Sequence, residues 1–458
     1  MARNMKHCYK NFFIKGLFML RKRILVKSTL ANLAFFVGFF LSFSSLHAAT
    51  LDQLVLDALT NNPDLAAAKA RWQQASHKAP QVGSLMDPVL SFAFSNYPHD
   101  DLSSDTAPMT GNEVKLAQAF PFPGKLDGRS AIANEQANWF ESVYRDQHFQ
   151  IARMVKDAWY RLYLKGRIIA VTERNLALID DIIRLTEVRY ETGSGLQQDV
   201  LKAQVQRSKL MEQLMSLRQQ QIAVQSELNS LLNRPSDSTF DVPEELELVD
   251  TDVSLDALQA AGEENRPMTT AYQSLLKRYR QQGKLAKLND YPDMTLWTSW
   301  RFRDDDLPDG GTDFVSAGIS VTLPVYREKR RAEKAEALAG LRMAEKQAES
   351  FQNSVEEKIR KAYSRMEETQ QQTKLYSEGI IPQTSQSLQS ALSSYQVGKV
   401  PFVSLLGALM TTYQAEMEYY RVSTEYMRSL AWLEAETTLP LIGPPLQDVD
   451  LQTSDFSK

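Results

Sequence analysis

The sequence predicts a mainly α-helical protein whose few β-strands join those of further copies in a membrane β-barrel. Three observations carry this prediction. Apolar residues recur every seven positions over long stretches, four strands of nine to eleven residues are expected, and the order of elements occurs twice. Four strands cannot close a barrel, and open strand edges are not tolerated in lipid, so several chains must pool their strands around one axis.

The most prominent element is a helical hairpin expected at about residues 128–232, which turns at Tyr190, Gly193 and Gly195. Two heptad stripes mark its first arm, one through Val155, Leu162, Ile169, Leu176, Ile183 and Tyr190 and the other through Leu164, Val171, Leu178 and Leu185. The stripes lie roughly 200° apart on the helix, so the arm has a partner on each side. The return arm repeats the heptad at Ala203, Leu210, Leu217, Val224 and Leu231. Helices with a neighbour on both flanks close naturally into a tube.

The N-terminus has the pattern of a secretory signal peptide at residues 1–48. Eight basic residues and no acid precede Leu30, an apolar run extends to Leu46, and Ala48 and Ala49 offer the cleavage site. The alternative is an uncleaved membrane anchor, although the run is shorter than the ~20 residues a span needs. Cleavage removes the only cysteine, Cys8, and leaves an acidic chain without disulfides, which argues against nucleic-acid binding. No later stretch predicts a transmembrane helix, so a membrane crossing requires strands.

Two structural repeats are expected, at residues 49–248 and 249–440, followed by an irregular tail at 441–458. The first contains strands at about 88–96 and 112–120, and the second contains strands at about 294–302 and 314–323 before a hairpin at about 326–436. Matching markers lie about 204 positions apart: Leu51 and Leu255, Pro63 and Pro267, Pro88 and Pro292, Tyr190 and Tyr395, Gly193 and Gly398. We expect Pro382 to kink the second long helix, and Trp297 and Trp300 to anchor the barrel at its interfaces.

With this duplicated order of helix, helix, strand, strand and two long helices, the chain resembles the TolC-type family of outer-membrane efflux channels. The resemblance covers Leu51 to about Leu441. It implies a homotrimer with one twelve-stranded barrel in outer-membrane lipid and a periplasmic tube of twelve helices. It also implies a periplasmic adaptor and an inner-membrane pump, of the RND type, as partners. The segment from Pro121 to Lys125 is similar to the strand-to-helix segment of heavy-metal members of the CusC and CzcC type.

The resemblance places a gate at the periplasmic tip and adaptor docking at the two turns, with Tyr190, Gly193, Gly195, Tyr395 and Gly398 as docking candidates. Family members narrow the pore with acidic side chains just after the second turn. In this sequence those positions hold Ser404 and Gly407, whereas the first half has Asp199. Asp199 either contributes a ring of carboxylates or is a solvated or helix-capping residue.

No catalytic constellation accompanies these elements. The sequence has no phosphate-binding loop, dinucleotide fingerprint or nucleophile elbow, and its five histidines lack ligand spacing. Met211, Met215, Met410 and Met417 fall at helical spacing, which favours core packing over copper ligation, and the acidic loop at 304–311 favours a solvated extracellular loop over a calcium site.

The sequence therefore predicts no enzyme, no cofactor and no metal site, but a passive exit duct whose cargo includes heavy-metal cations as one possibility. The competing hypothesis is a periplasmic coiled-coil scaffold or adaptor without a pore. It would leave the alternating strands unused.

Overall fold

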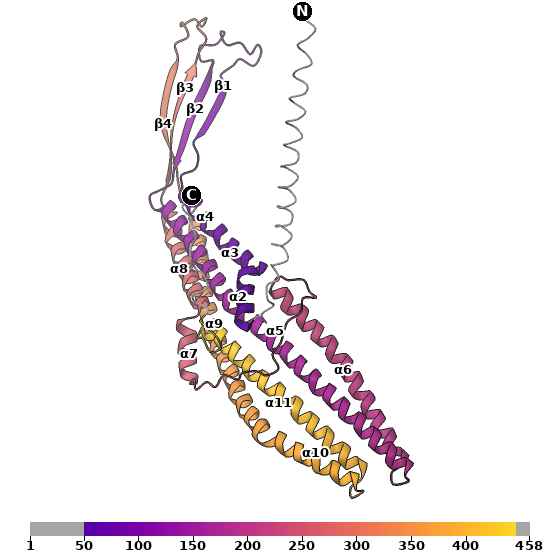
Figure 1. Cartoon of the computed structure of the whole chain (residues 1–458). Helices are drawn as coiled ribbons and strands as arrows, with labels where there is room; N and C mark the ends of the chain where they lie inside the picture. Colours follow the sequence, from indigo (N-terminus) through magenta and orange to yellow (C-terminus); the bar gives the residue numbers. More distant parts are fainter. Residues whose placement is uncertain (1–49, 446–458) are drawn as a thin grey trace, which may run out of the picture. The chain divides into compact units, whose positions relative to one another are not determined.

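The computed structural model describes residues 50–445 (Figure 1). The signal peptide expected at 1–48 and the end of the expected tail, residues 446–458, lie outside the described residues. The first half contains α2 (Leu51–Asn61), α3 (Pro63–Ser76), α4 (Lys78–Gly83), β1 (Val89–Ser95), β2 (Gly111–Phe120), α5 (Lys125–Glu191) and α6 (Gln197–Leu231). The second contains α7 (Leu255–Glu264), α8 (Pro267–Leu288), β3 (Asp293–Phe302), β4 (Phe314–Thr322), α9 (Arg327–Leu375), α10 (Ile381–Gln396) and α11 (Phe402–Thr437).

The four strands form one antiparallel sheet in the order β1-β2-β3-β4. Residues directly opposite in register share a face. One face is dominated by apolar side chains: Leu90, Phe92, Phe94, Val114, Leu116, Leu296, Trp300, Phe302, Val315, Ile319 and Val321. The other is mostly small or polar, and includes Ser91, Glu113, Lys115, Thr295, Ser299, Arg301, Ser316 and Ser320. The apolar face is uncovered in the protomer, with Phe92 74% and Phe94 83% exposed.

The two tryptophans of β3 do not share a role, because residues three apart in a strand point to opposite faces. Trp300 lies on the apolar face, where it stacks on Phe302 and its Nε1 donates to Asp313 at 2.9 Å. Trp297 lies on the polar face, with the Lys115 ammonium 4.3 Å from its ring centroid. Of the two residues expected to anchor the barrel at its interfaces, only Trp300 therefore lies on the apolar face.

The long helix α5 begins three residues before the expected Gly128. Gly124 adopts φ 86°, which lets the chain turn sharply after Pro123 and start the helix at Lys125. The buried Lys125 ammonium donates to Asp293 at 2.8 Å and to the Tyr291 carbonyl at 2.9 Å. This contact ties the start of α5 to the start of β3. With 67 residues, α5 extends about 100 Å.

The second long helix is interrupted by a π-helical turn at Tyr376–Ile380, directly before α10. Pro382 falls in the first turn of α10. Its ring clashes with the carbonyl four residues earlier and it has no N–H to donate, so the wider π-turn accommodates it without ending the helix. The expected disturbance at Pro382 thus takes the form of a π-turn.

The hairpins pack through α5, which contacts α6 on one side and α11 on another. Their core includes Val171, Ile179, Ile182, Ala203, Leu210, Tyr395, Phe402, Leu405, Leu409 and Tyr413. The stripe of the return arm is buried at Ala203, Leu210, Leu217 and Val224. On α5 the expected stripes are buried at Val155, Leu162 and Val171. Toward the turn, the stripe residues Leu176, Leu178, Ile183 and Leu185 are partly buried and pack around Ile179 and Ile182, which lie between the two stripes. One helix with two partners buries the line between both contacts most deeply.

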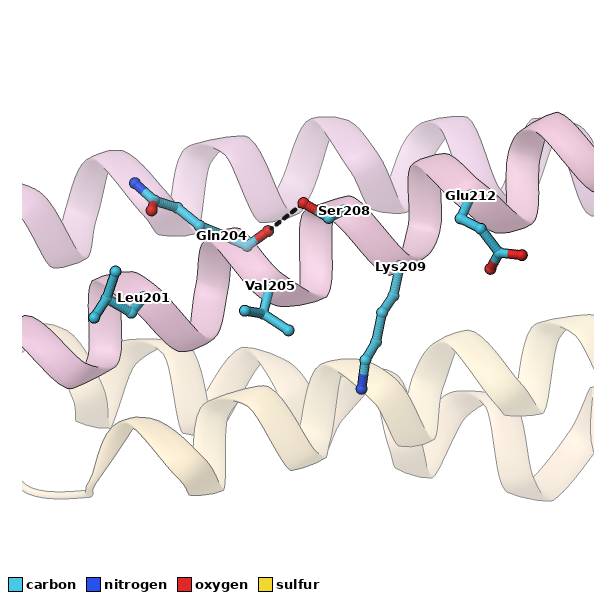
Figure 2. A pocket seen from close by; sticks show the side chains of 6 residues that line it. All are labelled: Leu201, Gln204, Val205, Ser208, Lys209 and Glu212. Atoms are coloured by element: carbon cyan, nitrogen blue, oxygen red, sulfur yellow. Dashed lines mark hydrogen bonds between the residues drawn. The ribbon is translucent and has the colours of Figure 1, made fainter.

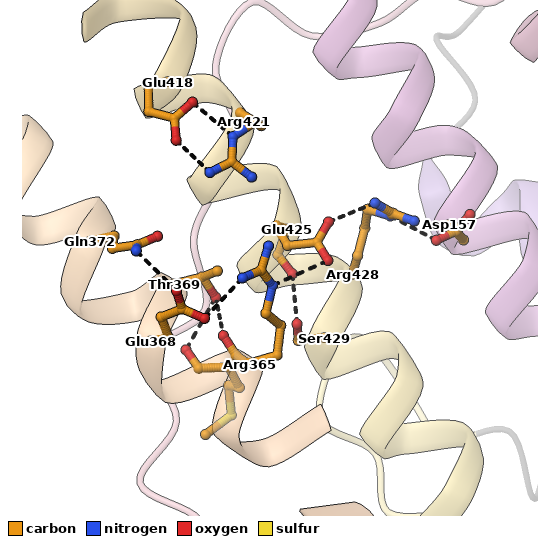
Figure 3. A network of polar contacts seen from close by, with 11 residues as sticks. Asp157, Arg365, Glu368, Thr369, Gln372, Glu418, Arg421, Glu425, Arg428 and Ser429 are labelled. Carbon is orange, nitrogen blue, oxygen red and sulfur yellow. Dashed lines mark hydrogen bonds and ion pairs between the residues drawn. The ribbon is translucent and has the colours of Figure 1, made fainter. Parts of the chain in front are cut away.

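Ion pairs on the helix surfaces join α5, α11 and α9 (Figure 3). Arg428 of α11 donates to Asp157 of α5 at 2.7 Å and to its neighbour Glu425 at 2.6 Å. Arg365 of α9 approaches the same Glu425 at 3.6 Å. Such partly exposed pairs contribute little each, and mainly fix the register of the three helices.

Two buried ion pairs hold the end of α11. Lys156 of α5 donates to Glu434 at 2.6 Å and to the carbonyl of Ile442 at 2.7 Å. Arg266, before α8, bonds both Asp146 and Glu436. Burial raises the pKa of Glu434 to about 7, partly opposed by Lys156.

In the described part of the chain, no helix has the length and apolar character needed to cross a bilayer.

Candidate functional site

The first turn, at residues 192–196 between α5 and α6, contains a glycine in the left-handed conformation. Gly193 adopts φ 71°. Its N–H donates to the Tyr190 carbonyl at 3.0 Å, and the Ser194 N–H donates to the Arg189 carbonyl at 2.8 Å. This pair of bonds satisfies carbonyls at the end of α5 that have no partner within the helix. The Tyr-x-x-Gly spacing in the sequence encodes this helix end.

The second turn repeats the same geometry. Gly398 adopts φ 73°, its N–H donates to the Tyr395 carbonyl at 3.0 Å, and the Lys399 N–H donates to the Ser394 carbonyl at 2.9 Å. The corresponding residues are therefore Gly193 and Gly398, and Arg189 and Ser394. The backbones match, but the side chains before the glycines differ.

Arg189 links the two turns. Its Nη2 donates to the Ser194 carbonyl of its own turn at 3.0 Å. Its Nη1 donates to the Tyr395 carbonyl and, at 3.3 Å, to the Gln396 carbonyl of the other turn. The guanidinium also lies over the Tyr395 ring, 4.7 Å from the centroid. One side chain thus holds the ends of both helical hairpins, and we call this set of contacts the Arg189 clamp.

Tyr395 and Tyr190 occupy equivalent positions but different environments. Tyr395 is 3% exposed and packs edge-on against Phe402, with ring centroids 5.8 Å apart, whereas Tyr190 is 47% exposed. Burial raises the pKa of the Tyr395 hydroxyl, the charge of Asp199 adds to the rise, and Arg189 opposes it. Within residues 50–445 that hydroxyl has no hydrogen-bond partner. Only Tyr190 of the two is accessible in the protomer.

A cleft of about 420 Å³ lies between the two turns. Its walls include Arg189, Asp199 and Lys202 from the first hairpin and Tyr395, Phe402 and Val403 from the second. Gly193 and Gly195 line it as well. Ser404 and Gly407 are exposed on α11 and do not line this cleft. The structure therefore places Asp199 among the side chains that join the turns and does not bring it together with Ser404 and Gly407.

Sequence reasoning missed Arg189 and Lys202. Arg189 is the only basic residue in the last turn of α5, a position where a cation faces free carbonyls. The position of Arg189 in the last helical turn can be read from the sequence. Its contact with the other hairpin cannot, because the packing of α5 against α11 sets the distance between Arg189 and Tyr395.

In residues 50–445 no three His, Cys, Asp or Glu side chains are grouped so that they could hold a metal ion. In the acidic loop after β3, Asp304 accepts a hydrogen bond from Ser104 at 2.6 Å and Asp309 pairs with Arg303 at 2.7 Å.

Met410 and Met417 pack against the helical core, as expected, but Met215 is 63% exposed, so the expectation of core packing is wrong for Met215 in the protomer.

Comparisons with known proteins agree with this fold. The family described as "Outer membrane efflux protein" matches residues 54–234 and 258–437. No curated protein matches the sequence.

Among solved structures, VceC of Vibrio cholerae is similar with 19% identity and a TM-score of 0.72, covering 84% of this chain and 95% of that one. CmeC of Campylobacter jejuni has 15% identity and a TM-score of 0.72, with 84% and 85% covered. CusC has 16% identity and a TM-score of 0.70, with 84% and 91% covered. At these identities the similarity establishes a common fold.

Proposed function

The chain belongs to the outer membrane efflux protein family, and from this premise we propose that it is the passive exit duct of a tripartite efflux system. As a family member it is a non-enzymatic outer membrane efflux channel with a periplasmic helical extension. The energy would come from an inner-membrane pump, for which we propose the RND type, and the connection from a periplasmic adaptor.

The observation that carries the proposal is the two-faced sheet. One face is apolar and uncovered, the other is polar, and neither β1 nor β4 has a second strand neighbour in residues 50–445. Unpaired strand edges are costly in lipid, and strands of other copies would satisfy them. We propose a homotrimer in which three sheets close one twelve-stranded barrel, with the apolar face toward lipid and the polar face toward the lumen.

The outer side of α6 supports the same assembly (Figure 2). A heptad stripe of exposed positions follows this helix through Leu201, Val205, Ser208, Glu212, Met215, Gln219 and Ile222. A hollow of about 640 Å³ lies along it, and every residue lining it belongs to α6, including Leu201 and Val205, which are 54% and 56% exposed. A heptad stripe without a partner in its own chain suits a helix of a neighbouring copy.

We propose that the two turns are the tip at which the duct closes and meets its adaptor. The Arg189 clamp would hold the hairpins together in the closed state, which supplies a closing contact where Ser404 and Gly407 offer no carboxylate. The exposed Tyr190, Leu196 and Val397 around the glycines would offer the adaptor an apolar surface. Asp199 would act in this tip through its charge next to Tyr395.

For the cargo we propose heavy-metal cations, on the acidic composition of the chain and the segment from Pro121 to Lys125. CusC is one of the structures with this fold, which is compatible with the proposal but does not select it over a drug or a peptide. Growth of a strain lacking the protein would test it: we expect hypersensitivity to metal salts, restored by the wild-type gene. Unchanged metal tolerance together with sensitivity to organic compounds would reject the metal cargo.

Membrane fractionation tests the duct against a scaffold without a pore. We expect the full chain in the outer-membrane fraction as a trimer that resists extraction by salt and alkali. A chain released by salt, or recovered as a soluble periplasmic protein, would favour the scaffold.

A further inference from the structure

The polar face of the sheet carries four charged residues, and most of them neutralise one another. Arg301 Nη2 donates to Glu113 Oε2 at 2.9 Å across β3 and β2. Asp293, at the start of β3, accepts from Lys125 at 2.8 Å. The fourth is Lys115, in the middle of β2, and no carboxylate in residues 50–445 lies within ion-pair distance of it. Because Arg301 pairs with Glu113, and Lys125 of α5 pairs with Asp293, Lys115 is the one charge on this face without an ion-pair partner in the described residues.

The Lys115 ammonium is held in place by Trp297. It lies over the indole, 4.3 Å from the ring centroid. The indole in turn lies against Gly318 of β4, where a Cβ would come within 2.6 Å of the indole Cζ2. Trp297 thus spans the polar face from β2 to β4, and Gly318 leaves the room for it. A cation over an aromatic face is attracted to the ring, and the contact fixes its position.

We propose that Lys115, positioned by Trp297, gives the duct an anion-favouring ring in the membrane-level part of its lumen. This inference rests on the proposed function, because three copies must close the sheet around one axis with the polar face inward. Three equivalent ammonium groups then face the passage at one level. The local charge is opposite to that of the acidic chain as a whole, so net charge alone does not predict the ion preference.

The ring should bias passive current rather than decide which cargo a pump delivers. Three unit charges acting in water across about one Debye length of ~10 Å change the anion-to-cation permeability ratio by about fourfold. A solute carrying a carboxylate or phosphate would meet less resistance at this level than a bare cation.

The test uses the full chain with Lys115→Cys in planar bilayers. The single native cysteine, Cys8, lies in the predicted signal peptide, so after cleavage the introduced thiol is unique. We expect the substitution to lower the anion preference, measured as the reversal potential in a KCl gradient. A trimethylammonium methanethiosulfonate reagent should restore the preference, and a sulfonate reagent should shift it further toward cations.

Leu116→Cys provides the matched control, because residue 116 is adjacent but lies on the apolar face. We expect neither reagent to alter its current. Equal permeability ratios after both reagents at position 115 would overturn the proposal, as would modification that blocks current at 116 and not at 115. If the unmodified wild-type chain forms no channels, the proposed function fails first; if it forms channels that ignore the charge at 115, this inference alone fails.

Discussion

Removing the Arg189 clamp should open the tip of the duct. In Arg189→Ala, the guanidinium loses its hydrogen bonds to the Tyr395 and Gln396 carbonyls of the other turn, its hydrogen bond within its own turn, and its cation–π contact with Tyr395. The side chain is half-buried, so we assign about 1 kcal/mol to each hydrogen bond and about 0.5 to 1 kcal/mol to the ring contact. The two hydrogen bonds and the ring contact that join the turns sum to about 2.5 to 3 kcal/mol per protomer, which corresponds to a roughly 70- to 150-fold change in the ratio of open to closed tips.

The assay is the open fraction of single channels in planar bilayers. We expect Arg189→Ala to raise it strongly and Arg189→Lys to have an intermediate effect, since an ammonium can reach one carbonyl but cannot fork between two turns. Arg184→Ala is the matched control. Arg184 lies on the same helix but pairs with Asp181, and both side chains are exposed. An open fraction for Arg189→Ala equal to that of wild type and Arg184→Ala would refute the role of the clamp.

Three further outcomes follow from the structure. Arg266→Ala leaves Asp146 buried without its cation and Glu436 with only Lys358, at 3.9 Å, and we expect a loss of about 3 to 5 kcal/mol in unfolding free energy by denaturant titration. Arg331→Ala, in an exposed pair, should cost below about 1 kcal/mol, and equal effects of the two substitutions would contradict the buried cluster. Burial raises the pKa of Glu434 from the ordinary 4.5 to about 7, so its contribution to stability is greatest below pH about 4.5 and falls as the pH rises through about 7. The stability difference between wild type and Glu434→Gln should decline over that window, and a flat or rising difference would contradict the raised pKa. Val205→Glu places a charge in the exposed α6 stripe, and we expect it to shift the trimer toward monomer in native mass spectrometry, whereas Gln220→Glu, exposed on the same helix outside the hollow, should not. An intact Val205→Glu trimer would show that the contact between copies does not involve this stripe.

The sequence was sufficient for the parts of the fold that depend on periodicity. The heptads on the return arm predict the buried positions Ala203, Leu210, Leu217 and Val224, and period-two alternation predicts the four strands to within about two residues. Because these patterns repeat over many residues, a single residue that departs from the pattern does not change the predicted element. The turns at Gly193 and Gly398 were also predictable, because a glycine after a helix encodes a left-handed cap.

Features that depend on tertiary distance were not predictable. Trp297 and Trp300 look alike in the sequence, and only strand register assigns one to each face of the sheet. Arg189 appears as a solvated cation at a helix end, and its reach to Tyr395 follows from the packing of α5 against α11. Tyr190 and Tyr395 match in the repeat, yet one is exposed and the other buried, since each turn has different neighbours.

The most direct test of the central claim, that several copies of this chain form a membrane duct, is ion conductance by the purified full chain in a planar bilayer. The account predicts discrete channels that appear only with the trimeric fraction and that open more often in Arg189→Ala. A trimeric fraction that inserts and yet conducts no ions, with the clamp intact or removed, would contradict it.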